Sequence, residues 1–546
     1  MRRMLLTAVV LLAGVAACTP EAPAPAPGTA VLAVGERATS LAPVLPATRR
    51  TADQEAADLL FLRLAGLGAD HRTTGDDGFE PQLARSWSRR DSITLAFELD
   101  PRARWHDGAP VTAHDVVFTF GLARDSIFSS TLSGLLRHIR SVTAESDHLV
   151  VIGFDQPYAE QLYDAVFHVQ PLPAHLLEQM SPEEMRTSPF VQAPVGNGPY
   201  HIVADNAETL ELAASDSFFL GRPGIRRVVI RVVPDPDARL NLLLSGELDA
   251  LGAVIPPLEN AARISDAHAL RLIQVPSNTV GYLLFNQRDP TNLARPHPIL
   301  SDSSVRRALV LALDRASMVR AVLGSSAQVP YGPVSKQLWI GNRSPEARGQ
   351  DLAAARTLLA SAGWRDSDGD GTLEKGGRPL RLSLMVPTQS ATRRQMALQI
   401  QEQLRQVGAA IDLAVIEGSV TGERRNKGQF DIDFSSATQD PTPAGLTQSW
   451  TCRGGSNVAH YCDPAVDSLI ERAILASRGA DTLWQSALRR IERDAPAAFM
   501  YAPTTVYAVS SRFDHVDIRP ESAWITLWRW TVKPGEAIAR DRTPGS

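Results

Sequence analysis

The stretch LARSWSRRDSITLAFELDPRARWHDGAPVTAHDVVFTF, residues 83–120, decides the fold. Apolar residues alternate with polar or small ones from Ile93 to Leu99, which is the pattern of a strand with one buried face. The residues WHDG at 105–108 follow, and Asp-Gly is a turn signal. A helix is expected to begin near Asp115. No nucleophile stands beside a base here, so the stretch indicates architecture rather than catalysis.

The N-terminus has the parts of a signal peptide, predicted over residues 1–17. A basic pair opens the chain, and the apolar run at 5–15 is too short to span a membrane. A cysteine directly after Val-Ala-Ala resembles the lipobox of bacterial lipoproteins, which implies that Cys18 is lipidated. An ordinary signal peptide with an incidental cysteine is the alternative. Residues 18–28, rich in Pro and Ala, are typical of a stiff, extended tether.

Length and composition limit the class of protein. Without the leader roughly 520 residues remain, more than one hydrophobic core organises, so at least two lobes are expected. No other run of eighteen apolar residues occurs, which predicts a soluble body outside the cytoplasm. The net charge of −5, with mixed signs, gives no basic stripe for nucleic acid. A hydrophobic fraction of 44% indicates a globular chain.

Two cysteines remain once Cys18 is assigned to the anchor. Cys452 and Cys462 flank a Gly-Gly-Ser-Asn turn in an oxidising compartment, which favours a local disulfide. So short a loop would contribute somewhat under roughly 3 kcal/mol. The alternative uses both cysteines and His460 as metal ligands. Three ligands without a nearby fourth make zinc the weaker interpretation.

Several further blocks punctuate the chain. In VGNGPY, at 195–200, the glycines permit positive φ angles and a proline fixes the next turn, which predicts a sharp chain reversal. The block lacks the Lys-Ser/Thr that a phosphate-binding P-loop needs. LLLSGELDA at 242–250 predicts a helix that a glycine ends before the chain turns into a strand. YLLFN at 282–286 is expected to be a strand.

The second half alternates helical and strand patterns. Asp302 is expected to cap one continuous helix, with apolar residues through Val322 and Gly324 as its end. A further helix is expected at about 351–362, closed by Gly-Trp. A strand, a helix and a strand at 380–386, 395–407 and 411–415 form a βαβ unit, which predicts parallel strands.

Two other segments could carry function. The loop DSDGDG at 366–371 has acidic residues at positions 1, 3 and 5 and glycine at 6 of a calcium loop, but position 12 is Gly377. A solvated turn is the expectation. Near the C-terminus, Trp524, Trp528 and Trp530 would share one face of a strand. They could grip a ligand, but packing is favoured.

Taken together, these blocks resemble, in the same order, the extracytoplasmic solute-binding proteins of peptide-type ABC importers, family 5. The family contains dipeptide-, oligopeptide- and nickel-binding proteins. Its motifs LA.SW…WHDG.P.TA.DV.F.F, G-T-G-P-Y, LLSGEIDA, VRQAL..AIDR and LL..AGW match blocks between about Val31 and Pro534. The resemblance implies an α/β, two-lobed periplasmic binding protein fold with ligand in the interlobe cleft. Ligand contacts with both lobes would stabilise the closed form, which a transporter recognises.

The resemblance also implies how the chain is divided. The first lobe would comprise residues 29–280 and 506–546, with 83–195 as an extra subdomain. The second lobe would comprise residues 285–505. Two crossing strands, near Phe285 and near Tyr507, would act as the hinge.

In peptide-binding members a carboxylate of the second lobe pairs with the α-ammonium of the peptide, in a segment resembling GW..D…DP…F. The corresponding run here is FSSATQDPTP at 434–443, where small polar residues replace Gly-Trp. Asp440, beside Gln439, is the carboxylate of this short run that could take the role. The alternative is a turn residue before Pro441.

Four other residues are candidates for ligand contact. Arg424 could pair with a carboxylate or phosphate, although an arginine in a loop is more often solvated. Trp450 could line the cleft or pack in a core. Asn286 and Tyr331 are placed near the hinge by family position alone.

The sequence therefore predicts a lipid-anchored, monomeric receptor in the cell envelope that captures a small solute, most often a peptide. Its partners would be an ABC permease and, indirectly, its ATPase. No cofactor, metal or enzymatic activity is expected, since G-x-S-x-G, H-E-x-x-H and Ser-x-x-Lys do not occur in a plausible context. A nickel- or metal-chelate binder is an alternative, although the twelve histidines form no evident cluster. A non-transport sensor on the same scaffold is another.

Overall fold

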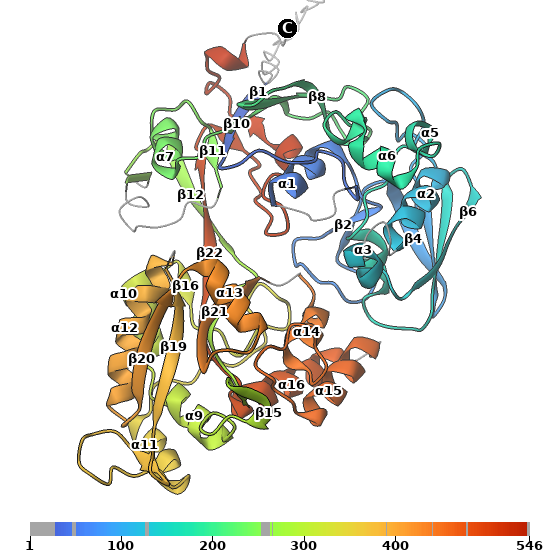
Figure 1. Cartoon of the computed structure of the whole chain (residues 1–546). Helices are drawn as coiled ribbons and strands as arrows, with labels where there is room; N and C mark the ends of the chain where they lie inside the picture. Colours follow the sequence, from blue (N-terminus) through green and yellow to red (C-terminus); the bar gives the residue numbers. More distant parts are fainter. Residues whose placement is uncertain are drawn as a thin grey trace, which may run out of the picture.

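The computed structural model of the chain describes residues 28–45, 51–125, 130–252, 263–264, 266–388, 390–438, 441–476 and 479–542. The signal peptide, Cys18 and most of the tether lie outside these residues, and so do Gln439 and Asp440. The described chain forms two lobes with separate hydrophobic cores, joined by extended strands (Figure 1). The predicted two-lobed α/β architecture is confirmed. Within this part of the chain, no helix is both long and apolar enough for a membrane crossing.

The first lobe is built on one half of a mixed sheet. β1 (Gly28–Val34) pairs in parallel with β10 (Ile225–Val232) and with β11 (Ala250–Leu251). β9 (Thr209–Ala214) and β8 (Tyr200–Asp205) extend the sheet as an antiparallel edge. β1 is buried along almost its whole length, as expected for a central parallel strand that is covered on both faces.

A separate four-stranded antiparallel sheet, in the order β4-β5-β7-β6, forms within residues 83–195. Its strands are β4 (Ala84–Asp91), β5 (Thr94–Leu99), β6 (Ile139–Ser146) and β7 (Leu149–Phe154). Leu95, Phe97 and Leu99 are buried, as their period-two pattern predicts. The expected helix is α2 (Ala113–Arg124), which Thr112 and Asp115 cap reciprocally.

The WHDG turn packs against the glycine motif. Trp105 is fully buried, and its indole N–H lies 3.4 Å from Asp115 Oδ2. The amide of His106 donates to the Gly196 carbonyl (2.8 Å), and its ring Nε2 lies 3.0 Å from the Gly198 carbonyl oxygen. Burial lowers the pKa of His106 to about 4, so the ring is neutral at ordinary pH. Both motifs therefore belong to the frame of the first lobe.

The glycines of VGNGPY have a different purpose from the predicted one. Neither Gly196 nor Gly198 has a positive φ. A Cβ on Gly196 would lie 2.1 Å from the Leu60 carbonyl oxygen, and one on Gly198 would lie 2.6 Å from the Leu60 carbonyl carbon. The motif needs glycine because its backbone lies directly against the end of α1 (Thr51–Leu60).

The second lobe contains the predicted βαβ unit. β19 (Arg381–Pro387) and β20 (Ala410–Ile416) are parallel, and α12 (Ala391–Arg405) connects them. α13 (Gly418–Asn426) then leads to β21 (Ile432–Thr438), which pairs in parallel with the other side of β19. The parallel pairing and the helical connection agree with the strand–helix–strand pattern of the sequence.

The helix predicted after Asp302 is in fact two helices. α9 (Ser303–Leu311) begins at the Asp302 cap, and α10 (Arg315–Leu323) ends at Gly324. Between them Asp314 acts as a second N-cap, because its carboxylate accepts the amide N–H of Ser317 at 3.0 Å. A cap inside an apolar helical pattern restarts the helix, which the periodicity alone does not reveal.

Two segments cross between the lobes. β12 (Leu270–Pro276) lies in the first lobe and β13 (Thr279–Phe285) in the second. β22 (Ala497–Ser510) pairs with β13 through its first half and with β12 and β11 through its second half. β16 (Ala327–Gln328) pairs with residues 502–503, the middle of β22. Twelve described strands thus form one sheet that runs through both lobes.

The C-terminal tryptophans do not form the predicted strand ladder. Trp528 lies within a short 3-10 helix, η3 (Leu527–Arg529), and Trp524 and Trp530 lie on either side of it in the sequence. Trp524 and Trp530 are buried with ring centroids 6.1 Å apart, and Trp524 also contacts Tyr507 at 6.0 Å. The prediction of a strand was wrong, whereas the favoured alternative, packing of the rings in the core of the first lobe, is confirmed.

The remaining described elements connect or cover these sheets. They are β2 (Ala65–Leu67), β3 (Phe79–Pro81), α3 (Ser130–Leu135), α4 (Gln161–Val166), α5 (Ala174–Leu177), α6 (Pro182–Thr187), η1 (Pro189–Val191), α7 (Pro236–Leu244), β14 (Arg288–Asp289), β15 (Asn292–Pro296), α11 (Leu352–Ser361), β17 (Glu374–Lys375), β18 (Arg378–Pro379), η2 (Pro443–Gly445), α14 (Leu446–Trp450), α15 (Pro464–Leu475), α16 (Ala480–Asp494), β23 (Phe513–Asp514), β24 (Thr531–Val532) and η4 (Ala539–Asp541).

Candidate ligand-binding site

The carboxyl ends of the parallel strands in the second lobe face the first lobe. Thr438, the last residue of β21, bonds through its hydroxyl to Thr279 (2.7 Å), the first residue of β13 beside the crossing. α13 lies on the same side of the lobe (Figure 1). The strand order in this part of the sheet is β20-β19-β21. The connection from β19 leads to β20 on one side, and the connection from β20 passes β19 to reach β21 on its other side. The direction of the connections therefore reverses between β19 and β21. Open α/β sheets bind ligands in the crevice outside such strand ends.

A group of polar side chains lies along these strands, and we call it the strand-end cluster. Its members are Tyr282, Arg393, Arg425, Asp433 and Ser436. The guanidinium of Arg393, from the first turn of α12, donates to Ser436 Oγ at 2.5 Å and reaches the Tyr501 hydroxyl at 3.4 Å. Arg425, from the last turn of α13, forms an ion pair with Asp433.

The electrostatics of the strand-end cluster favour an anionic group nearby. Asp433 is fully buried, and burial raises the pKa of its carboxyl group, although the ion pair with Arg425 opposes this. Burial, followed by the charge of Asp433, raises the pKa of Tyr282 to about 12. Asp433 is paired with Arg425, whereas the hydrogen bonds of Arg393 go to neutral groups, namely the Ser436 and Tyr501 hydroxyls and the Phe434 carbonyl, so Arg393 leaves positive charge at the strand ends.

The residues predicted to bind ligand are only partly brought together. Gln439 and Asp440 lie outside the described residues; in the sequence they directly follow β21. Arg424 is exposed on α13, beside Arg425 of the strand-end cluster. Tyr331 is half-buried three residues after β16, and burial raises the pKa of its phenol.

The structure gives Trp450 and Asn286 framework roles. Trp450 is 3% exposed and packs edge-on against Phe499, with ring centroids 5.4 Å apart. Asn286 is fully buried, and its amide donates to the carbonyl oxygens of Gly428 and Phe430, both at 2.9 Å. Trp450 thus packs in a core, one of the two alternatives named for it, and Asn286 holds the loop before β21; ligand contact by either side chain stays a prediction.

Sequence reasoning missed Arg393 and Asp433. A signal for each exists in the sequence. Asp433 is an acidic residue inside the apolar strand FDIDF, where a charge requires a partner. Arg393 follows a predicted parallel strand and opens the next helix, which is where ligand-binding residues of α/β sheets concentrate.

The first lobe has a small pocket at the carboxyl ends of β1 and β10. Its lining is mainly apolar and includes Leu41, Ile230 and Trp524, with Glu55 as a partly exposed acid. Burial raises the pKa of Glu55 to about 7, the negative charge of Asp58 adds to this, and a hydrogen bond with Trp524 opposes it. Such a cavity suits an apolar group or a weakly basic one.

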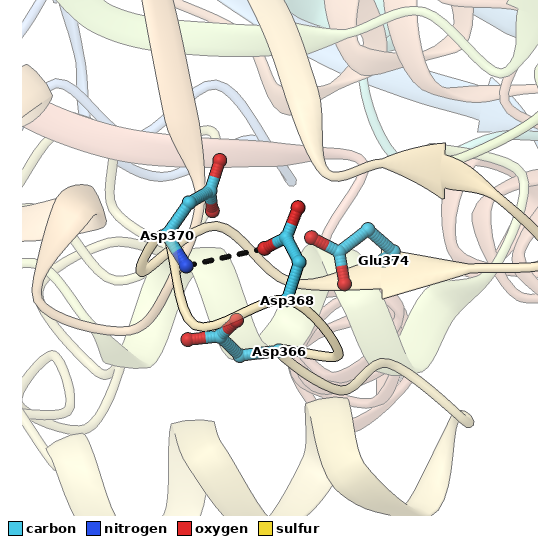
Figure 2. A group of neighbouring side chains, drawn as sticks. All are labelled: Asp366, Asp368, Asp370 and Glu374. Carbon is cyan, nitrogen blue, oxygen red and sulfur yellow. Dashed lines mark hydrogen bonds between the residues drawn. The ribbon is translucent and has the colours of Figure 1, made fainter.

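The acidic loop brings four carboxylates together, from Asp366, Asp368, Asp370 and Glu374 (Figure 2). Their oxygens lie within 4.8 Å of one another on the surface. Asp366 accepts the amide N–H groups of Gly369 (2.7 Å) and Gly371 (3.1 Å). The carboxylates of the other three likewise accept amide N–H groups within the loop. These bonds explain the arrangement as a turn held by its own side chains.

Cys452 and Cys462 lie at disulfide distance, with Cα atoms 4.3 Å apart. His460 adopts the left-handed conformation between them, with φ of 55°. Burial lowers the pKa of its ring. Among the described residues, the group of side chains close enough to hold a metal ion together is that of the acidic loop. It includes neither cysteine nor His460.

Comparison with known proteins identifies the class. The family model described as "Bacterial extracellular solute-binding proteins, family 5 Middle" matches residues 78–458, and the chain belongs to this family. The family places the protein outside the cytoplasm, in the periplasm or beyond. Its members are binding proteins rather than enzymes.

Individual relatives have low sequence identity to this chain, but the matches cover most of both chains. The oligopeptide-binding protein AppA of Bacillus subtilis is 24% identical over 82% of both chains. A probable di/tripeptide-binding protein of Pseudomonas aeruginosa is 28% identical over 78% of this chain and 81% of its own. The structure of AppA with a nonapeptide superposes with a TM-score of 0.71 at 23% identity, covering 93% of this chain and all of that one. The nickel–histidine complex of NikZ from Campylobacter jejuni gives 0.71 at 22% identity, covering 92% of this chain and 99% of that one.

Proposed function

We propose that this protein is a lipid-anchored receptor that captures a small peptide between its lobes and delivers it to an ABC permease. The observation that carries the proposal is Arg393 of the strand-end cluster, which follows the carboxyl end of β19 and donates to Ser436 near the carboxyl end of β21. Relatives named as oligopeptide- and di/tripeptide-binding proteins support peptide as the ligand class. In this proposal Cys18 carries the lipid, the receptor is a monomer, and it stays in the cell envelope.

The proposed contacts fit a ligand that carries both charges. Asp440 would accept the α-ammonium group and Gln439 its neighbouring amide. Arg393, with Arg424 at the rim, would take a carboxylate, because a guanidinium binds a carboxylate through two parallel hydrogen bonds. Tyr331 would contact the ligand from beside the crossing.

A second candidate ligand is an anionic metal chelate. The excess of arginine over carboxylate in the strand-end cluster favours an anion. Relatives of known structure include one that binds a nickel–histidine complex and one that binds Fe(III)-EDTA. In this candidate the arginines would hold the chelating molecule, and the protein itself would supply no metal ligand.

Calorimetric titration of the protein distinguishes the candidates. Alanine di- to pentapeptides, the same peptides with acetylated N-termini, and nickel–histidine are titrated in turn. We expect the free peptides to bind and to raise the melting temperature by mass action. Asp440→Ala should weaken free peptides and leave acetylated ones unchanged, whereas Asp412→Ala, on the exposed edge strand, should change neither. If only nickel–histidine binds, the peptide proposal fails.

We further infer the division of the chain and the pairing of its cysteines. The first lobe would comprise residues 29–280 and 506–546, with 83–195 as the extra subdomain, and the second lobe 285–505. The separate hydrophobic cores support this division. The 4.3 Å between their Cα atoms supports a Cys452–Cys462 disulfide. Mass spectrometry of the unreduced protein tests the pairing.

A further inference from the structure

A buried hydrogen-bonded contact joins the two lobes. The carboxylate of Glu160, in the first lobe, lies 2.7 and 2.6 Å from the hydroxyl of Thr442, in the second. Thr73 Oγ1, also from the first lobe, donates to Glu160 Oε1 at 2.5 Å. Beside this group the amide of Ala159 donates to the carbonyl of Ile474 across the same boundary, at 3.3 Å.

The contact lies on segments that are themselves fixed. Glu160 immediately precedes α4, and the residue before it is held because the Gly75 amide N–H donates a hydrogen bond to the Ala159 carbonyl oxygen (2.8 Å). Thr442 caps η2, because its hydroxyl accepts the Ala444 amide at 3.0 Å. It therefore stands in the short connection that follows β21 and its strand-end cluster. A change at Thr442 would act on the position of that connection.

Within the part of the chain that the structure describes, no cation pairs with Glu160. The residue is 6% exposed, and no ion pair to it occurs among the described residues. A charged group that acts on it is Asp164 of α4, which accepts the Tyr158 hydroxyl at 2.7 Å and lies 3.8 Å from His168. The hydrogen bonds that its carboxylate accepts come from the hydroxyls of Thr73 and Thr442. A carboxyl group buried in this way is more stable when it is neutral.

We propose that Glu160 and Thr442 form an interlobe latch, and that closing the latch is coupled to the uptake of a proton by Glu160. In the closed form burial raises the pKa of Glu160 to about 7, with Asp164 adding to the effect and the two threonine hydroxyls opposing it. When the lobes separate, water reaches the carboxyl group and its pKa returns toward the ordinary value of about 4.3. The closed form thus binds the proton more tightly.

Linkage then fixes the direction of the effect. Because the closed form has the higher pKa, closure is favoured as the pH falls through about 7 and is least favoured when Glu160 is ionised in both forms. An acidic medium outside the cell would favour capture, and a less acidic one would favour release. The latch depends on two lobes that open and close, and not on which ligand they enclose.

Small-angle X-ray scattering of the protein without ligand, between about pH 5 and pH 8.5, tests the latch across the transition that linkage predicts. We expect the radius of gyration to be smaller at low pH, with a transition near neutrality. Glu160→Gln, a neutral isostere, should remove this transition and keep the compact form throughout. Thr442→Val should give the larger radius at every pH, because the hydroxyl donor of the second lobe is gone.

Two control variants separate the latch from general effects. Glu521 is another buried acid of the first lobe whose pKa burial raises to about 7, so Glu521→Gln should leave the pH transition of the radius in place. Thr357→Val, on the exposed face of α11, should behave as the wild type. The latch is wrong if the wild-type radius is constant with pH, or if Glu160→Gln keeps the wild-type transition. If Glu160→Gln does not fold, Thr442→Val decides: a radius equal to the wild type's overturns the latch.

Discussion

Arg425 is the ion-pair partner of Asp433, which is fully buried. Removing the arginine leaves a buried carboxylate whose principal partner is gone, which costs about 3 to 5 kcal/mol for a wholly buried pair. Because the Arg425 side chain is 27% exposed, we expect a smaller loss for Arg425→Ala, roughly 2 to 3 kcal/mol. Urea denaturation measures it. Arg424→Ala, the exposed neighbour on α13, is the control and should change the free energy of unfolding by less than about 0.5 kcal/mol. Equal effects of the two would contradict the buried pair.

Glu521 gives a prediction about pH. Burial raises the pKa of its carboxyl group from 4.5 to about 7, so above pH 7 the folded state must hold an ionised buried group. The folded state binds this proton more tightly than the unfolded one, and the stability that it contributes is lost as the pH rises toward 7. Glu521→Gln should therefore stabilise the protein at pH 8.5, by at most about 3 kcal/mol, and much less at pH 5.

Thermal melts of the Glu521→Gln variant and of the wild type, compared across this pH range, provide the measurement. The exposed Glu208→Gln is the control and should show no such pH dependence. A difference between Glu521→Gln and wild type that is the same at both pH values would show that the gain has another cause.

Single residues mark the limit of what the sequence predicts. Asp440 could be proposed because a family motif surrounds it. Arg393 and Asp433 each leave a signal in the sequence, but their partners, Ser436 and Arg425, lie on other elements and could not be predicted from it. Asn286 was a candidate by family position alone, and Trp450 was expected either to line the cleft or to pack in a core. Which side of a strand or short helix meets the core is a tertiary property, and both side chains lie on the core side.

At the scale of elements, the contact between VGNGPY and α1 makes a sharp prediction. Gly196→Ala would place a Cβ 2.1 Å from a backbone oxygen that cannot move without shifting the end of α1. Overpacking of this kind costs about 1 to 3 kcal/mol, and more where backbone must shift. We expect Gly196→Ala to lower the denaturation midpoint strongly or to prevent folding. Gly349→Ala is the matched control, since its Cβ would meet nothing within 4 Å and its φ is not positive. A mild effect at Gly196 would disprove the close approach.

Elements were predicted well where one local pattern decides them. The period of two in β5 and the βαβ order of β19, α12 and β20 were both confirmed. The single helix after Asp302 and the tryptophan strand were wrong, because a second cap and a 3-10 turn interrupt patterns that look continuous. Capping and ring packing compete with periodicity at the level of one or two residues, and the sequence does not show which one prevails.

At the scale of the whole molecule, the order of the motifs predicted two lobes, but their mutual placement depends on contacts between distant residues. Thr442 and Glu160 are 282 residues apart, and nothing in either neighbourhood predicts their meeting. β22 is similar, since nothing in the sequence of this 14-residue strand shows that its two halves pair in different lobes. The fold therefore follows from local patterns, whereas the geometry of closure does not.

The latch and the ligand segment can be separated by their effects on binding. Thr442→Val weakens closure for every ligand, because closure adds the same interlobe bonds whatever lies in the cleft. We expect faster dissociation, by roughly tenfold, for free and acetylated peptides alike, with little change in the association rate. Asp440→Ala should instead affect free peptides alone, since it removes a partner of the ammonium group. Stopped-flow release at pH 6 measures both, and it should show the Thr442→Val effect shrinking at pH 8.5, where ionised Glu160 already weakens the latch of the wild type. A Thr442→Val effect confined to free peptides would place Thr442 in the ligand site and remove it from the latch.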